Sequence, residues 1–321
     1  MKKNWGPVWF ELRAQKGQSD LCTFMYSETP GGKMVHAHFP HREADGLGRL
    51  LTTLEKDGLP LKIEHKKLTP PPRWMNLPLL VKGLLKHPVA KKNPWKSFVS
   101  KPSEPPDRAA TITLTSQEDD ALKSRARAEG VSPSFLMLSI ATDLIRDRLY
   151  KNAEDEAYWL FPVDLRGAFP EAALNELTLS FVPLHFTNRA MTALQSNYQK
   201  LRQQLKSGEY WAYYALYHIG DWIGRGGMKF LVDRTHEKSF WMGSFSDLGS
   251  WTQPELCESA FKDRVWSLSP PGSPSYPFGL TNIEWCGKRS ITMRIHPSIT
   301  DEDTVTLASE LLEKLRKTIV S

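Results

Sequence analysis

The sequence predicts a mixed α/β fold, with strands and helices interspersed along its 321 residues. Segments typical of strands recur from one end to the other, and amphipathic segments with a helical period lie between them. Hydrophobic residues make up 40% of the chain, which is enough for a sizeable buried core, and no internal repeat is present. No run approaches the ~18 apolar residues of a membrane span, so we expect no integral membrane segment.

The N-terminal part is predicted to contain three strands followed by a helix. The strands occupy residues 6–15, 21–28 and 33–39. In the third of them apolar and polar residues alternate, as in a strand with one buried face. The leucines that follow recur at helical spacing, which predicts an amphipathic helix that ends at Gly58. Asp45 directly precedes this pattern and is the predicted N-cap.

A proline-rich, basic segment, residues 61–108, is predicted to connect an N-terminal subdomain, residues 1–60, to a C-terminal subdomain, residues 109–321. Its prolines exclude one continuous element, although a short helix is expected at residues 77–85. Residues 65–103 hold nine lysines and arginines and no acidic residue. Such a cluster can attract a phosphate-bearing cofactor or an acidic protein, or it can be a solubilising linker. No nucleic-acid-binding signature is present, so we expect no nucleic-acid partner.

The C-terminal part is predicted to begin with a strand at residues 111–115 and a helix from Ser116, with Gly130 after its end. Ser132 and Pro133 then form the N-cap and first position of a second helix, whose apolar density predicts burial. Further strands and helices alternate to the end of the chain. The strands lie at residues 157–169, 177–187 and 238–251, a hairpin at 278–297, and the helices at 190–208, 210–232 and 301–320.

The three cysteines are isolated in the sequence and have no metal-binding spacing. They fit a reduced protein without a disulfide framework. The N-terminus starts basic but lacks the apolar region of a signal peptide. We therefore expect a cytoplasmic protein.

His41, Asp45 and Gly46 form the pattern HxxxDG at the turn between the third strand and the helix. Such turns often carry function, so His41 is either a catalytic base or a loop histidine beside an ordinary helix cap. A zinc site is another alternative, because His36, His38 and His41 could offer three imidazoles. A proline and a turn separate the last two, and no carboxylate completes the set, so we expect no metal.

Two later segments accompany this pattern in order: WLFPVDLRGAF at residues 159–169 and GSFSDLGSW at residues 243–251. With them, the chain resembles the chloramphenicol acetyltransferase-like superfamily, which includes wax ester synthase/diacylglycerol acyltransferases and peptide-synthetase condensation domains. The resemblance implies a mixed-sheet fold of two subdomains, with the active site in a channel between them. It also implies direct acyl transfer from a thioester of CoA or of an acyl-carrier protein to a small-molecule alcohol or amine. No permanently bound cofactor and no acyl-enzyme are implied.

The resemblance assigns roles to four residues around the motif. His41 would be the general base, since a neutral imidazole can take a proton from an attacking hydroxyl or amine. Asp45 would be structural, together with Gly46, and would pair with Arg166 of the PVxxR-like strand. A bidentate arginine suits a carboxylate buried in a turn and would fix the loop that carries His41.

The tetrahedral intermediate of acyl transfer also needs a hydrogen-bond donor for its oxyanion. The resemblance places this donor in the turn after the late strand, at Ser246, with Ser244 as the alternative. Lys91, Lys92 and Lys96 of the basic segment would meet the phosphate of CoA or the acidic surface of a carrier protein.

The sequence departs from the superfamily at three places. Pro40 stands where HHxxxDG has its first histidine, the Ser246 turn lacks most of the usual letters, and only 40 residues precede His41. The resemblance therefore implies an N-terminally shortened subdomain, with another chain or a homo-oligomer interface replacing the missing part. An alternative function also stays open, a non-catalytic acyltransferase-like binding partner in a biosynthetic assembly.

Overall fold

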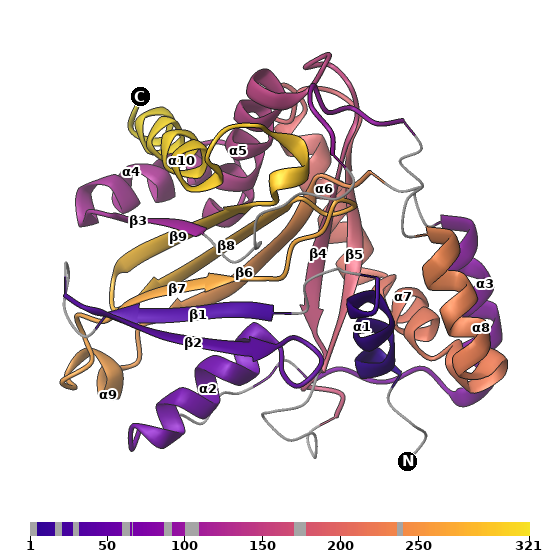
Figure 1. The fold of residues 1–321 in the computed structure, drawn as a ribbon. Coiled ribbons are helices and arrows are strands. Elements are labelled where there is room, and N and C mark those ends of the chain that lie inside the picture. Colours follow the sequence, from indigo (N-terminus) through magenta and orange to yellow (C-terminus); the bar gives the residue numbers. More distant parts are fainter. Residues whose placement is uncertain are drawn as a thin grey trace.

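The computed structural model describes residues 5–16, 21–27, 32–59, 65, 67–86, 92–99, 109–169, 178–235 and 240–321. Within these residues helices and strands alternate, and the strands form one larger and one smaller sheet. Figure 1 shows the larger sheet in the middle of the molecule, with the smaller sheet below it. The predicted mixed α/β class is confirmed.

The larger sheet is mixed. Its strands are, in spatial order, β3 (Ala109–Leu114), β9 (Lys288–Ile295), β8 (Phe278–Trp285), β6 (Gly243–Trp251), β4 (Ala157–Asp164) and β5 (Leu179–Phe186). β6 runs parallel to β4 and β8, whereas the other neighbouring strands are antiparallel. β4 and β6 pair only through Trp159–Gly243 and Leu160–Ser244, which lie at the start of β6 and in the first half of β4. Beyond these pairs the two parallel strands separate, and this opening positions the site described below.

The smaller sheet brings together strands from the N-terminal and C-terminal parts of the chain. Its order is β2 (Met34–Pro40), β1 (Leu21–Ser27) and β7 (Val265–Ser269), all antiparallel. β7 lies in the C-terminal half of the sequence and was not predicted as a strand. The predicted N-terminal subdomain, residues 1–60, therefore shares its sheet with a strand of the predicted C-terminal subdomain.

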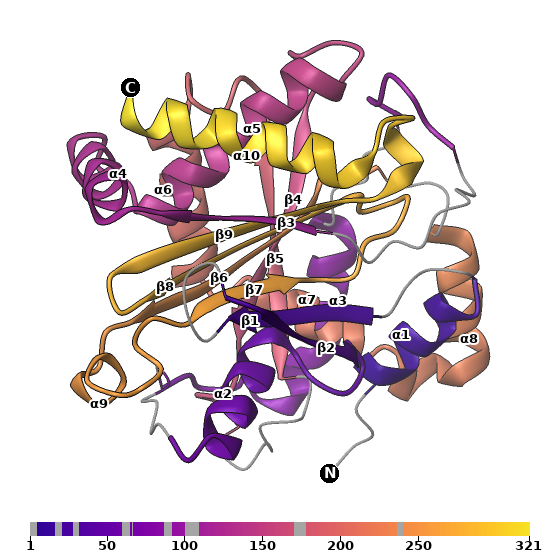
Figure 2. The ribbon, with the colours of Figure 1, turned by 60° about the vertical axis from the view of Figure 1, so that its left-hand side comes forward.

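Three helices cover one face of the larger sheet: α4 (Ser116–Ala128), α5 (Pro133–Leu149) and α10 (Thr304–Val320). Figure 2 shows α10 lying across this face, above β3 and β9. The predicted start of α5 is confirmed, since the Ser132 hydroxyl accepts a hydrogen bond from Phe135 N at 3.2 Å. These helices and the sheet enclose the largest apolar core.

The remaining helices lie at the edges of the two sheets, and of these only α1 and α2 contribute described residues to the site below. They are α1 (Gly6–Ala14), α2 (Gly46–Lys56), α3 (Asn76–Lys86), α6 (Leu194–Lys206), α7 (Tyr210–Tyr217), α8 (Gly220–Thr235) and α9 (Pro254–Cys257), with the 3₁₀ turns η1 (Arg73–Met75) and η2 (Pro297–Ile299). α7 packs between β5 and α3. α3 is the short helix that was predicted at residues 77–85 of the proline-rich segment. None of the described helices is long and apolar enough to cross a membrane.

The leucines of α2 pack against tryptophans of the C-terminal half. Leu50, Leu51 and Leu54 are buried in a second core with Trp251, Trp266 and Trp285. This contact accounts for the helical spacing of the leucines, because each of them faces the same side of α2. α2 is thereby held against the smaller sheet, and the turn before it has a fixed position.

The prediction of a strand at residues 6–15 is wrong, because these residues form α1. Val8 and Leu12 lie one turn apart and are buried, with Trp5, against Met228 and Val232 of α8. This burial has the period of a helix, and local alternation of apolar and polar residues hid it. Figures 1 and 2 both show α1 beside α8.

The single helix predicted at residues 210–232 is also wrong. The segment forms α7 and α8, with a turn at His218 and Ile219 between them. α8 is itself kinked at Gly224, whose φ of 65° lies in the left-handed region that glycine tolerates best.

Candidate active site

His41 lies on the turn that leads from β2 into α2. Its Nδ1 is 3.1 Å from the carbonyl oxygen of Ala44. A carbonyl only accepts hydrogen bonds, so Nδ1 carries the ring proton in the neutral imidazole. Nε2 is then the basic nitrogen, and within the described residues no hydrogen bond to Nε2 is present. The Phe10 ring packs against the imidazole in an edge-to-face arrangement, with 4.6 Å between ring centroids.

The surroundings of His41 favour its neutral form. Burial lowers the pKa of His41 below its ordinary value, and the nearby Arg13 guanidinium acts in the same direction. The Ala44 carbonyl and the Asp45 carboxylate oppose this shift without reversing it. At neutral pH the ring is therefore unprotonated at Nε2, which is the state a general base requires.

Asp45 is buried and holds four hydrogen bonds. Its Oδ1 accepts from Gly48 N at 2.8 Å, which makes it the N-cap of α2. The Arg166 Nη2 donates to both carboxylate oxygens, at 3.0 and 2.9 Å, and Thr178 N donates to Oδ2 at 3.3 Å. Asp45 thus serves as helix cap and as partner of an arginine 121 residues away. These bonds fix the turn that carries His41.

Arg166 continues the network toward a second carboxylate. It donates through Nη1 to Oδ1 of Asp164 at 3.0 Å, and the other oxygen of Asp164 lies 2.8 Å from Nδ1 of His65. Arg166 is buried, whereas the Asp164 carboxylate is one-third exposed. The guanidinium therefore has two carboxylate partners that compensate its burial.

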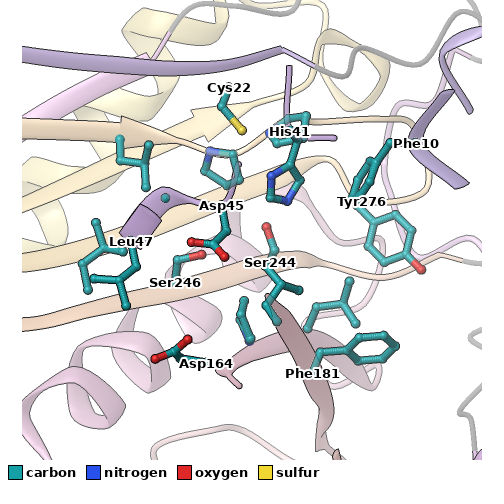
Figure 3. Close-up of a pocket in the computed structure, with 18 of the residues that line it drawn as sticks. Phe10, Cys22, His41, Asp45, Leu47, Asp164, Phe181, Ser244, Ser246 and Tyr276 are labelled. Atoms are coloured by element: carbon teal, nitrogen blue, oxygen red, sulfur yellow. The ribbon is translucent and has the colours of Figure 1, made fainter. Parts of the chain in front are cut away.

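A pocket with a cavity volume of about 210 Å³ opens where β4 and β6 separate. His41, Asp45, Gly46 and Arg166 all line it. Figure 3 shows His41 near its middle, with Leu47 on one side and Phe10 and Tyr276 on the other. The wall is mostly apolar and aromatic, with a few polar groups directed inward, which is typical of small-molecule sites. α1, α2 and both sheets contribute to this wall.

Ser244 and Ser246 both line the pocket from β6. They are two residues apart, so their side chains emerge on the same face of the strand. In Figure 3 the Ser244 hydroxyl points toward the His41 ring, whereas Ser246 points toward Asp45. This placement favours Ser244 over Ser246 as the group next to a reacting atom at His41.

Gly46 is the first residue of α2 and contacts β7. A Cβ atom added to it would lie 2.3 Å from Cδ2 of Leu268, which is far inside van der Waals contact. Glycine therefore allows the start of α2 to approach the smaller sheet, and this accounts for the glycine after Asp45.

The three lysines predicted to bind the thioester donor do not line the pocket as far as they are described. Lys92 is exposed and lies 3.5 Å from Asp155. Lys96 donates to the carbonyls of Asp147 and Arg148 at the C-terminal end of α5. Lys91 lies outside the described residues, so the basic donor site stays a prediction.

The described residues contain no group of three metal-binding side chains. His38 is exposed on β2 and is 3.4 Å from the Thr23 hydroxyl, while the side chain of His36 is outside the described part of the structure.

Sequence reasoning missed the contribution of α1. Trp9, Phe10 and Arg13 line the pocket from one turn of this helix. The incorrect strand prediction hid their shared face. Arg13 follows Phe10 by three residues and Trp9 by four, and this helical spacing was the signal that could have found it. Asp164, which also lines the pocket, lies inside the WLFPVDLRGAF segment and was given no role there.

No protein-family model and no curated protein matches the sequence. Among solved structures, polyketide synthase associated protein 5 from Mycobacterium tuberculosis is similar, with a TM-score of 0.54 and 14% identity over 90% of this chain and 73% of that one. The condensation domain of the Monacolin K polyketide synthase gives a TM-score of 0.55 and 12% identity, over 89% and 68%. The first condensation domain of the calcium-dependent antibiotic synthetase gives 0.51 and 11%, over 90% and 64%. The chain therefore has the chloramphenicol acetyltransferase-like mixed α/β fold of these condensation domains.

Proposed function

We propose that the protein is an acyltransferase that moves an acyl group from a thioester to an alcohol or an amine. The observation that carries this proposal is the orientation of His41. Its Nδ1–H is bonded to the Ala44 carbonyl, so the basic Nε2 is the nitrogen that can meet a substrate in the pocket. The fold supports the same reaction class, since two of the similar structures are condensation domains.

In the proposed reaction, Nε2 of His41 takes the proton of the acceptor O–H or N–H. The freed electron pair attacks the thioester carbonyl carbon and forms a tetrahedral oxyanion. Collapse of this intermediate breaks the C–S bond, and the thiolate takes the proton back from Nε2. Direct transfer needs no acyl-enzyme, and His41 ends the cycle in its starting state.

A serine hydroxyl of β6 would donate to the oxyanion. The sequence favoured Ser246, but the geometry favours Ser244, whose hydroxyl points toward His41. A preorganised donor at this position stabilises charge that develops only in the transition state. Asp45 and Arg166 do not take part in proton transfer in this scheme, and they hold the His41 turn in place.

The donor would be CoA or the phosphopantetheine arm of an acyl-carrier protein, and it would enter as a co-substrate. The basic segment with Lys92 and Lys96 would then meet phosphate or acidic protein outside the pocket. Leu47 and the neighbouring leucines Leu248 and Leu268 give one side of the pocket an apolar lining that suits an acyl group.

The test is a thiol-release assay with a panel of acyl-CoA donors and small alcohols and amines. His41→Ala is expected to lower the rate by about 10²- to 10⁴-fold, as loss of a general base does. His38→Ala is the matched control, because His38 is an exposed histidine on β2 three residues earlier. Equal rates for wild type and His41→Ala would refute the role of His41.

A non-catalytic binding partner is the competing function. Pro40 in place of the first histidine of the motif and the atypical serine turn favour it. The two functions differ in one measurement: a non-catalytic partner would release no thiol from any CoA or carrier-bound donor, while its pocket could still bind ligands.

A further inference from the structure

A stripe of large apolar side chains is exposed along η1 and α3. Its four members recur every three or four positions, so they lie on one side of the helix. They are 75%, 50%, 47% and 82% exposed, in chain order. These residues, called the α3 stripe below, are Trp74, Leu77, Val81 and Leu85.

The opposite face of α3 is fixed against α7. Leu80 and Gly83 lie three residues apart on α3, and both are buried. A Cβ atom added to Gly83 would lie 2.7 Å from the backbone carbonyl oxygen of Ala212, so the backbones of the two helices are in close contact. This contact sets the rotation of α3 about its axis and keeps the α3 stripe directed outward.

Exposed apolar residues are concentrated at this end of the molecule. Among the described residues, eleven large apolar residues are exposed, and the α3 stripe and α8 together contribute seven of them. On α8 the most exposed are Trp222 and Phe230, at 61% and 60%. Figure 1 shows α3 and α8 at the same end of the molecule. Single exposed apolar residues are ordinary on a protein surface, but a concentration of this kind marks a contact surface.

The segment that carries the α3 stripe is positively charged. Residues 65–103 contain nine lysines and arginines and no acidic residue. Lys82, which directly follows Val81 in the sequence, is exposed. α3 therefore combines an apolar face with positive charge, which is complementary to an anionic surface. A second copy of the chain would bring the same positive charge to the contact, so the charge disfavours self-association through this face.

The shape and composition of this end suit a lipid bilayer. The α3 stripe stands on a single helix, and none of its four residues lines the pocket of the active site. A bilayer accepts side chains that project from one helix, because lipids rearrange around them and no matching groove is required. Tryptophan is enriched at the level of the lipid headgroups, and both tryptophans among the exposed residues described, Trp74 and Trp222, lie at this end.

We propose that the α3 stripe binds the surface of an anionic lipid membrane. Leu77, Val81 and Leu85 would enter the boundary between headgroups and acyl chains. Trp74 would lie at the headgroup level, and Lys82 would pair with lipid phosphate. None of the described helices could cross a membrane, so the protein would lie on the bilayer through this face. The proposal is independent of the proposed acyl transfer, because these residues lie outside the pocket.

The test is flotation of the protein with unilamellar vesicles in a density gradient. One vesicle set is phosphatidylcholine alone, and the other contains phosphatidylglycerol as one-third of its lipid. Wild type should bind the anionic vesicles about 10-fold more tightly than the neutral ones, and added salt should reduce this difference. The double variant Trp74→Ser/Leu85→Ser should bind both vesicle sets at least about 10-fold more weakly than wild type. Lys82→Glu should weaken binding to the anionic vesicles by about 5-fold or more.

Two substitutions on α10 are the matched controls. Val320→Ser removes an apolar side chain from a residue that is 51% exposed, and Lys314→Glu reverses an exposed charge. Both variants should bind vesicles as wild type does. Thermal melts establish that each variant is folded.

Four results would overturn the proposal. The first three are no binding of wild type to either vesicle set, unchanged binding of Trp74→Ser/Leu85→Ser, and an equal loss of binding in the α10 controls. The fourth is a wild-type dimer in light scattering that binds no vesicles and becomes a monomer in the double variant, which would assign the α3 stripe to a second copy of the chain. Flotation requires neither a thioester nor His41, so its result is separate from that of the proposed transfer.

Discussion

Replacing Asp45 with alanine tests whether the buried ion pair anchors the His41 turn. The change removes the acceptor of the Gly48 bond, and loss of an N-cap costs about 1 kcal/mol. It also leaves Arg166 buried without its bidentate partner. Breaking a buried ion pair costs about 3–5 kcal/mol of stability. We expect a cost at the lower end of this range, because Arg166 keeps its bond to Asp164. The expected loss of stability is about 4 kcal/mol.

This loss translates into a measurable shift in melting temperature. At about 2.1 cal/mol/K per residue, a chain of 321 residues has an unfolding entropy of about 0.7 kcal/mol/K, so Tm should fall by about 6 °C. Differential scanning calorimetry measures this shift, and the thiol-release assay should show a parallel loss of rate. Glu302→Ala is the control, because it breaks an exposed pair with Arg148 that is worth at most about 1 kcal/mol. A Tm within 1 °C of wild type for Asp45→Ala would refute the anchoring role.

Three further predictions follow from the site and its surroundings. Ser244→Ala should lower kcat by about 10²- to 10³-fold and Ser246→Ala by less, and the reverse order in steady-state kinetics would assign the oxyanion to Ser246. Gly46→Ala should destabilise the protein by about 1–3 kcal/mol in urea unfolding, because its methyl group collides with a leucine of β7, and wild-type stability would contradict that contact. Burial and the charge of Arg294 lower the pKa of His296 to about 4 in the folded protein. As the pH falls, the His296 side chain is therefore protonated in the unfolded chain before it is protonated in the folded one. Stability should therefore decline by up to about 3 kcal/mol between pH 6.5 and 4, and a slope that His296→Gln does not flatten would exclude His296 as its source.

The local elements follow from short-range chemistry, and the sequence predicts most of them. Ser132 and Pro133 begin α5, and Asp45 caps α2, because caps and helical spacing depend on neighbours within one or two turns. The HxxxDG pattern and the PVxxR-like strand also indicated that Asp45 and Arg166 lie together, through the resemblance that both segments carry.

α1 shows where local pattern is insufficient. Apolar and polar residues alternate in this segment, which predicts a strand. The segment forms a helix because its buried face packs against Met228 and Val232 of α8, more than 200 residues later. β7 was missed for a related reason, since a five-residue strand is stabilised by its pairing with β1 and has little signal of its own.

The sequence by itself determined the chemical groups of the site: an imidazole on a strand-to-helix turn, a capping carboxylate and a distant arginine. Only the tertiary structure decided what surrounds them. The separation of β4 from β6 opens the pocket, the direction of each side chain favours Ser244 over Ser246, and α1 brings Arg13 close to His41. These features depend on contacts between residues far apart in the chain, which no local periodicity records.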